Sequence, residues 1–328
     1  MSALLEIRDL SKVYPAPGGA GVRALNRVSL TLHRGEVLGI VGESGCGKST
    51  LGRALLRLIE PTSGQVLFEG EDITALDRAA LKRRRRDLQI VFQDPFGSLN
   101  PRHRVGAIIR EPLDVHRIGS SPERAARVRE LLTIVGLPED AAGRYPHEFS
   151  GGQRQRIAIA RALALEPKLI VADEPVSALD VSIQSQIINL IADLRRRLGL
   201  SILFISHDLS VIRHVSDRIA VMYLGSIVET GPAGTVMETP THPYTQALLS
   251  AIPRPDAAGR RERIVLKGEL PDPAHPPSGC AFHTRCPFAM PVCTADPPAL
   301  VPRRHDGRIR EAACHLYEPA GAETPHAA

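Results

Sequence analysis

Short apolar runs alternate with segments of helical periodicity along the chain up to about Thr239. The runs Val37–Val41, Leu169–Ala172 and Ile202–Ile205 have the length and composition of buried strands. Between the last two, apolar side chains recur at helical spacing from about Ser182 to Leu198. Strands that alternate with helices in this way predict an α/β fold with a mixed, largely parallel sheet.

Three further segments near the N-terminus have the pattern of strands. Leu4–Ile7 is one, and Arg27–Leu32 alternates apolar and polar residues. Gln65–Glu69 alternates in the same way before Gly70, and we predict it to be an edge strand.

The stretch from about Pro95 to Leu165 differs because its pattern is mainly helical. Ser121 is predicted as the N-cap of one helix, with Pro122 in the first turn. Leu131 and Val135 continue the apolar face of that helix. We therefore expect a helical subdomain over about 95–165.

The composition changes after Thr239. Eight prolines punctuate the segment 240–277, and the apolar residues that follow are too few for a large core. We therefore predict one domain over 1–239, a small loop-rich domain over 240–318 and a disordered tail over 319–328.

Hydropathy and charge narrow the functional classes. No run approaches 18 apolar residues, and the first residues lack the features of a signal peptide, so we expect a cytosolic chain that meets membranes only through a partner. The net charge of +5 suits phosphate-bearing ligands without requiring nucleic acid. Aromatic residues make up 4% of the chain and Trp is absent, which argues against a platform for stacked bases. We interpret the basic runs Lys82–Arg86 and Arg195–Arg197 as solvated helix faces.

The segment Gly42–Thr50 matches the pattern G-x-x-x-x-G-K-[ST] between a buried strand and a helix. Such a loop curls backbone N–H groups around phosphate oxygens at a helix N-terminus. Lys48 is expected to reach the β- and γ-phosphates, and Ser49 to ligate Mg²⁺. The predicted nucleotide contacts from this loop are Gly42, Ser44, Gly45, Cys46, Gly47, Lys48, Ser49 and Thr50.

The strand Leu169–Ala172 ends in two carboxylates. Asp173 is predicted to hold Mg²⁺ through water, and Glu174 to act as the general base that polarises the attacking water. Both can border one site because they stand at a strand end.

A second anion site is predicted where Ser150, Gly151 and Gly152 precede the helix that begins at Gln153. One nucleotide does not need two such sites in one subunit. We therefore expect this second site to serve the nucleotide of a neighbouring subunit.

Taken together, these motifs resemble those of the ATP-binding subunits of ABC transporters, which implies a P-loop ATPase core with a helical signature subdomain. The resemblance assigns Ser150–Gln153 to the signature motif, although Phe149 stands where Leu is usual. Further assignments are Gln93 to the Q-loop, Ser177–Asp180 to the D-loop, His207 to the switch histidine and Tyr14 to adenine stacking. It implies that Gln93 and His207 act with Glu174 in catalysis, that Gln93 also ligates Mg²⁺, and that Asp180 lies near the nucleotide.

The resemblance also implies a head-to-tail dimer with two ATP molecules at its interface. ATP binding would close the dimer and hydrolysis would reopen it. This motion would pass to separate membrane subunits through a groove near Gln93.

Three segments resemble the peptide-uptake branch of that family: Gln93–Arg102, His242–Leu249 and Gly279–Cys286. They imply the second ATPase subunit of a dipeptide or oligopeptide importer, held at the cytoplasmic face of the membrane. The implied partners are a second, homologous ATPase, two permeases and an extracytoplasmic solute-binding protein, with no nucleic acid. Nickel, glutathione, opines or sugars stay open as substrates, as does a non-transport ATPase acting on ribosomes or DNA.

Four of the five cysteines gather near the C-terminus: Cys280, Cys286, Cys293 and Cys314. Their spacing, C-x5-C-x6-C-x20-C, is compatible with either Zn²⁺ or a [4Fe–4S] cluster. The resemblance favours the [4Fe–4S] cluster, because similar C-terminal domains of the branch carry one.

Overall fold

The computed structural model describes residues 2–15, 21–94, 97–252, 264–266, 268–305 and 308–317. The predicted disordered tail over 319–328 lies outside the described residues. So do Pro95 and Phe96, which follow the proposed Q-loop glutamine.

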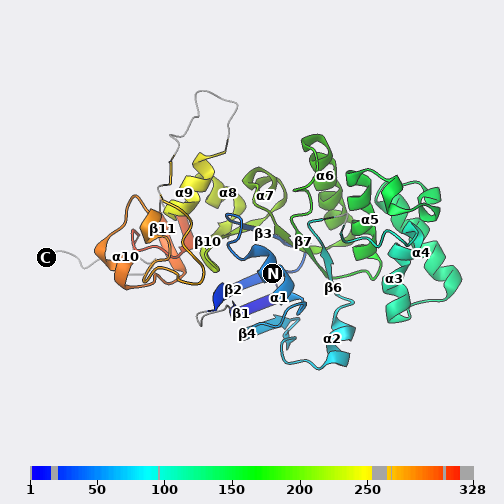
Figure 1. Cartoon of the computed structure of the whole chain (residues 1–328), viewed down its shortest axis with the longest axis horizontal. Coiled ribbons are helices and arrows are strands. Elements are labelled where there is room, and N and C mark those ends of the chain that lie inside the picture. The colour runs from blue at the N-terminus through cyan, green and yellow to red at the C-terminus, as the bar shows by residue number, and fades with distance from the viewer. Residues whose placement is uncertain are drawn as a thin grey trace.

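An eight-stranded sheet with the order β11-β12-β10-β9-β3-β8-β7-β6 forms the centre of the chain (Figure 1). Its strands are β3 (Val37–Val41), β6 (Leu88–Val91), β7 (Leu169–Asp173), β8 (Ser201–Ile205), β9 (Arg218–Tyr223), β10 (Ser226–Pro232), β11 (Val301–His305) and β12 (Arg308–Ala312). The strands from β6 to β9 in this order pair in parallel, whereas β10, β12 and β11 are antiparallel. The predicted α/β fold with a mixed sheet is therefore confirmed.

A second, antiparallel sheet has the order β2-β1-β4-β5. Its strands are β1 (Ala3–Tyr14), β2 (Val22–His33), β4 (Ser63–Phe68) and β5 (Glu71–Asp72). The prediction of an edge strand at Gln65–Glu69 is wrong, because β4 pairs with β1 on one side and β5 on the other. Gly70, with φ of +82°, turns the chain back so that Glu71 pairs with Phe68.

The helices cover both faces of the large sheet. They are α1 (Lys48–Leu55), α2 (Arg78–Arg84), α3 (Val105–His116), α4 (Ser121–Ile134), α5 (Gly151–Leu163), α6 (Val181–Leu198), α7 (Leu209–Val215), α8 (Ala233–Glu238), α9 (Pro243–Ser250) and α10 (Pro291–Ala295). Among the described helices, none is both long and apolar enough to cross a bilayer.

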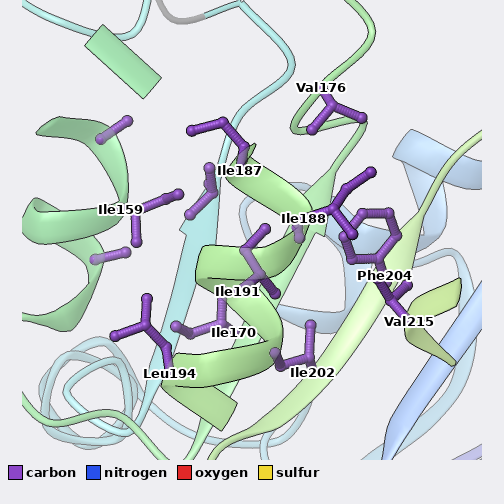
Figure 2. Close-up of a cluster of buried hydrophobic side chains, with 14 of the residues drawn as sticks. Ile159, Ile170, Val176, Ile187, Ile188, Ile191, Leu194, Ile202, Phe204 and Val215 are labelled. Carbon is purple, nitrogen blue, oxygen red and sulfur yellow. The ribbon is translucent and has the colours of Figure 1, made fainter. Parts of the chain in front are cut away.

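Successive residues of the parallel strands enter two different cores. In β7, Leu169 and Val171 pack with α1 and the small sheet, whereas Ile170 and Ala172 pack with the helices of the other face. On that other face, Ile191 and Leu194 of α6 lie in one cluster with Ile170 of β7 and Ile202 of β8 (Figure 2). The two layers fix the carboxyl ends of the parallel strands, where the loop Gly42–Thr50 and the acidic pair Asp173 and Glu174 lie.

The region after β6 contains α3, α4 and α5, with two 3-10 turns at Glu139–Gly143 and Pro146–Glu148. The predicted N-cap Ser121 is wrong by one residue. Ser120 has the extended conformation of an N-cap, and its N–H donates to the Glu123 carboxylate at 2.6 Å. Pro122 accordingly occupies the second helical position.

The C-terminal strands join the large sheet instead of standing apart from it. Ala312 of β12 pairs with Glu229 of β10, and β11 lies at the sheet edge. Tyr223 of β9, Tyr244 of α9 and Phe282 form an aromatic cluster, with ring centroids 4.7 to 5.5 Å apart. This cluster packs the segment that carries the first cysteines against the end of β9.

Candidate nucleotide site

The loop between β3 and α1 has glycine where the backbone approaches other strands closely. A Cβ on Gly42 would overlap the carbonyl oxygen of Met222 in β9, and one on Gly47 would overlap that of Ala24 in β2. Gly47 also has φ of +107°, which L side chains disfavour. The loop therefore lies directly on the strands beneath it, and its path depends on these two glycines.

Lys48 points back into the loop. Its Nζ donates to the carbonyl oxygens of Gly42 at 2.8 Å and Glu43 at 2.9 Å, and the side chain is buried. Cys46 is also buried, and burial raises the pKa of its thiol. The loop thus presents its backbone outward, together with an ammonium at its centre and the N-terminus of α1.

Ser49 and Asp173 bring two oxygen ligands together. Ser49 Oγ donates to Asp173 Oδ1 at 2.7 Å. Asp173 ends β7 and is 1% exposed, and burial raises the pKa of its carboxyl above the ordinary value. A hydroxyl and a carboxylate next to a phosphate loop are a suitable ligand set for Mg²⁺, so these residues fit that ion.

Glu174 leaves the strand in a left-handed conformation, with φ of +48°. Its N–H still donates to the carbonyl oxygen of Ile205 at 3.0 Å, so β8 holds its backbone. A non-glycine residue with positive φ carries strain that the surrounding structure must support. This turn explains how Asp173 and Glu174 both border one site although neighbouring strand residues point in opposite directions.

The Glu174 carboxylate lies between two polar side chains. Gln93 Nε2 donates to Glu174 Oε2 at 3.1 Å, and His207 Nδ1 lies 3.1 Å from the same oxygen. Gln93 follows β6 and His207 follows β8, so three parallel strands deliver these groups to one place. The structure therefore brings together the three side chains that the sequence predicts for catalysis.

A polar cavity of about 420 Å³ lies above the loop. Ala24 and nine of the predicted nucleotide and catalytic residues line it. The nine are Ser44, Gly45, Gly47, Lys48, Ser49, Thr50, Gln93, Glu174 and His207. Segments from five places in the sequence thus converge on one cavity that is open to solvent.

The predicted second anion site is not part of this lining. Ser150 caps α5, since the Gln153 N–H lies 3.4 Å from Ser150 Oγ and the Ser150 N–H donates to Gln153 Oε1 at 3.0 Å. A Cβ on Gly152 would overlap Ile183 of α6. Asp180 is exposed as the N-cap of α6. Tyr14 is 38% exposed at the end of β1, with Lys12 Nζ 5.1 Å from its ring centroid.

The four C-terminal cysteines are free thiols in the described part of the chain. The Cys280 N–H donates to the Cys293 carbonyl oxygen at 2.8 Å. Burial raises the pKa of Cys314 to about 11, and the thiols of Cys280, Cys286 and Cys293 add to that rise. The donors therefore fit a thiophilic metal in kind, but no three His, Cys, Asp or Glu side chains of the described part are arranged to hold a metal ion.

Sequence reasoning missed the role of Glu43 within the phosphate loop, and it missed Tyr244 and Arg285, which contact Glu43. Arg285 forms an ion pair with Glu43, and Tyr244 accepts a hydrogen bond from the Glu43 backbone. The sequence gives only two local signals for these residues. Glu43 occupies an unspecified position of the loop pattern, and Arg285 directly precedes Cys286.

Comparisons with known proteins agree with this geometry. Residues 25–177 match the model of the ABC transporter family, and residues 228–293 match that of the oligopeptide/dipeptide transporter C-terminal region. The oligopeptide transport ATP-binding protein AppF of Bacillus subtilis (strain 168) is 55% identical over 323 residues, which cover 96% of this chain and 97% of AppF. The chain belongs to the ATP-binding subunits of ABC transporters.

Other proteins similar to this ABC ATPase also bear names of transport systems. A putative peptide import ATP-binding protein of Brucella ovis is 55% identical over 297 residues, covering 90% of this chain and 93% of that protein. Among solved structures, a dimeric bacterial ABC transporter cassette, MJ0796, has a TM-score of 0.64 at 34% identity, covering 70% of this chain and 98% of that one. The cbiO1 subunit from Clostridium perfringens has a TM-score of 0.65 at 30% identity, covering 73% of this chain and 92% of that one.

Proposed function

We propose that this ABC ATPase uses ATP to drive the import of dipeptides or oligopeptides through separate permeases at the cytoplasmic face of the membrane. The observation that carries the substrate class is the C-terminal region. It matches the oligopeptide/dipeptide transporter model, and relatives at 55% identity bear names of peptide import. The assignment of ATP hydrolysis itself rests on membership of the ABC transporter family.

Within the cavity, we assign the loop and the acidic strand end to the triphosphate. Lys48 would exchange the carbonyl oxygens of Gly42 and Glu43 for the β- and γ-phosphates. Ser49 and Gln93 would ligate Mg²⁺, with Asp173 acting through water. When bound, the ion would supply positive charge that offsets the negative charge developing on the phosphates. Tyr14 would stack on the adenine.

Glu174 is assigned as the general base. Its carboxylate has one oxygen between Gln93 and His207, and it stands at the edge of the cavity that Lys48 enters. In this position it could take the proton of a water that attacks the γ-phosphate, while Gln93 and His207 orient it.

The signature segment Ser150–Gln153 and Asp180 would act on the nucleotide of a second, homologous ATPase. Their position away from the lining of the cavity supports this assignment, because the same helix terminus could close the cavity of a partner. The solved cassette with the same fold is a dimer, and one of its structures is a post-hydrolysis state bound to ADP and phosphate. Two permeases and an extracytoplasmic solute-binding protein would complete the importer, with no role for nucleic acid.

The test is reconstitution of the chain with its paired ATPase, permeases and binding protein in liposomes. Glu174→Gln should retain ATP binding while ATP turnover falls about 100-fold or more and peptide uptake ceases. Glu130→Gln, an exposed carboxylate of α4, is the matched control and should keep both activities. Wild-type turnover by Glu174→Gln would overturn the general-base role. Turnover stimulated by nickel, glutathione, an opine or a sugar, but by no peptide, would overturn the substrate class.

For the C-terminal cysteines we propose a [4Fe–4S] cluster, with Zn²⁺ as the alternative. The gathering of four thiols supports this proposal, and the cluster would have to draw them closer than they lie in the structure. Iron, sulfide and zinc content after anaerobic purification tests it, with about four irons and four sulfides expected per chain. Cys293→Ser should lose the metal, whereas Cys46→Ser, in the phosphate loop, should keep it. Zinc without sulfide would establish the alternative, and a metal-free wild type would refute both.

A further inference from the structure

Glu43 is the one acidic residue of the loop Gly42–Thr50. Its neighbours Ser44 and Gly45 line the cavity. A carboxylate at this place repels a triphosphate unless a cation neutralises it. The loop therefore contains a charge that opposes its own ligand.

Arg285 supplies that cation from a distant part of the chain. Its Nη1 donates to Glu43 Oε2 at 2.8 Å and its Nη2 donates to Glu43 Oε1 at 3.2 Å. The guanidinium therefore binds the carboxylate in a bidentate manner. The Arg285 side chain is 9% exposed, whereas that of Glu43 is 31% exposed. An ion pair of this kind differs from a surface salt bridge because one partner is almost withdrawn from water.

The backbone of Glu43 is held as well. Its N–H donates to the Tyr244 hydroxyl at 2.9 Å, and its carbonyl oxygen accepts from Lys48 Nζ at 2.9 Å. Tyr244 is fully buried in the aromatic cluster with Tyr223 and Phe282. One loop residue is therefore fixed through its N–H, its carbonyl and its side chain.

The segment that carries Arg285 is a short turn that is hydrogen-bonded to the backbone of Cys280. Residues His283–Arg285 form a 3-10 turn, in which the His283 N–H donates to the Cys280 carbonyl oxygen at 3.0 Å. The Arg285 N–H donates in turn to the carbonyl oxygen of Phe282 at 3.0 Å. Arg285 thus reaches the loop from a turn bounded by Cys280 and Cys286.

We propose that Arg285 is a positioning residue for ATP binding, which neutralises Glu43 and orders the phosphate loop from the C-terminal segment. Through it, the affinity of the ATPase core for nucleotide depends on the folded state of the cysteine-bearing turn. The proposal rests on the ATPase activity of the family, and it holds whether the transported solute is a peptide or not and whichever metal the cysteines bind.

Its test is the steady-state ATPase of the assembled importer, with KM for ATP and kcat measured separately. Arg285→Gln leaves Glu43 unpaired, so KM for ATP should rise about tenfold while kcat changes less than about twofold. Adding Glu43→Gln removes the repelling charge, so the double variant should return KM to within about threefold of wild type. Arg285→Lys should lie in between, because it keeps the charge but loses the fork.

Arg310→Gln is the matched control. Arg310 is a buried arginine of the same C-terminal region, and its guanidinium donates to the Thr235 carbonyl oxygen and the Thr239 hydroxyl. It should leave KM for ATP unchanged even where it lowers the melting temperature. An unchanged KM in Arg285→Gln would overturn the proposal. So would an equal rise in Arg285→Gln and the double variant, since that would show a general loss of folding instead of charge neutralisation. If Arg285→Gln does not fold, the KM for ATP of Arg285→Lys is compared in the same way with that of the double variant Arg285→Lys and Glu43→Gln.

Discussion

His242 gives the sharpest test of how the C-terminal region is joined to the ATPase core. It caps α9, where its Nδ1 accepts from the Tyr244 N–H at 3.1 Å, and its own N–H donates to Glu229 of β10 at 2.9 Å. The side chain is 1% exposed, and burial lowers its pKa to about 3, against the opposing effect of a hydrogen bond to the Ala313 backbone. The folded protein therefore keeps this imidazole neutral where the unfolded chain takes up a proton.

The size of the effect follows from linkage. An unfolded histidine has a pKa of about 6.5, so the stability that neutral His242 contributes is present above about pH 6.5 and is lost as the pH falls toward 3. Between pH 7 and pH 5 the loss amounts to about 2 kcal/mol in the free energy of unfolding. His242→Asn removes this titration, and the Asn side chain can still accept the capping hydrogen bond.

The backbone of His242 contacts the charged group of Glu229, and Arg310 interacts with that carboxylate. Burial raises the pKa of Glu229, so its contribution to stability has the opposite sign and grows as the pH falls. Arg310 stays charged throughout this range. Both residues are present in the wild type and in His242→Asn, and their effects cancel when the two proteins are compared.

The assay is urea unfolding of the purified chain at pH 7, 6 and 5, followed by far-UV circular dichroism. The wild type should lose about 2 kcal/mol more than His242→Asn between pH 7 and pH 5. His275→Asn is the control, because His275 is exposed beside Asp272, and it should follow the wild-type curve. Parallel pH curves for the wild type and His242→Asn would refute the reasoning.

Two further predictions concern the nucleotide site. Gly152→Ala places a methyl group against the Ile183 side chain of α6, so the packing of α5 on α6 must change. ATP binding to this chain should persist while turnover in the assembled complex falls at least about tenfold, as equilibrium binding and phosphate release would show. Ser49→Ala removes the hydroxyl that donates to the buried Asp173, so the Mg²⁺ concentration for half-maximal turnover should rise about tenfold, and an unchanged requirement would exclude Ser49 as a ligand.

Features with local signals could be predicted, whereas features that depend on distant segments could not. The loop Gly42–Thr50 is recognisable because its glycines, Lys48 and Ser49 follow a buried strand at fixed spacing. Nothing local indicates that Ala312 pairs with Glu229, since 82 residues lie between these two partners in the sequence. The left-handed conformation of Glu174 has no signal either, because glutamate rarely adopts it and only the surrounding contacts impose it.

Contacts from distant segments also hold the phosphate loop in place before nucleotide binds. Gly42 lies on the Met222 carbonyl, the Cys46 carbonyl accepts from the Gly225 N–H at 2.9 Å, and Glu43 is held by Tyr244 and Arg285. Each support comes from a part of the chain that is distant from the loop in the sequence. The conformational entropy of the loop is therefore lost during folding and not during nucleotide binding. Lys48 is the exception, because its ammonium must leave two carbonyl oxygens to reach phosphate. ATP binding therefore requires the rearrangement of one side chain on a backbone that the rest of the fold has already set, and Arg285 is the support whose removal also exposes a charge.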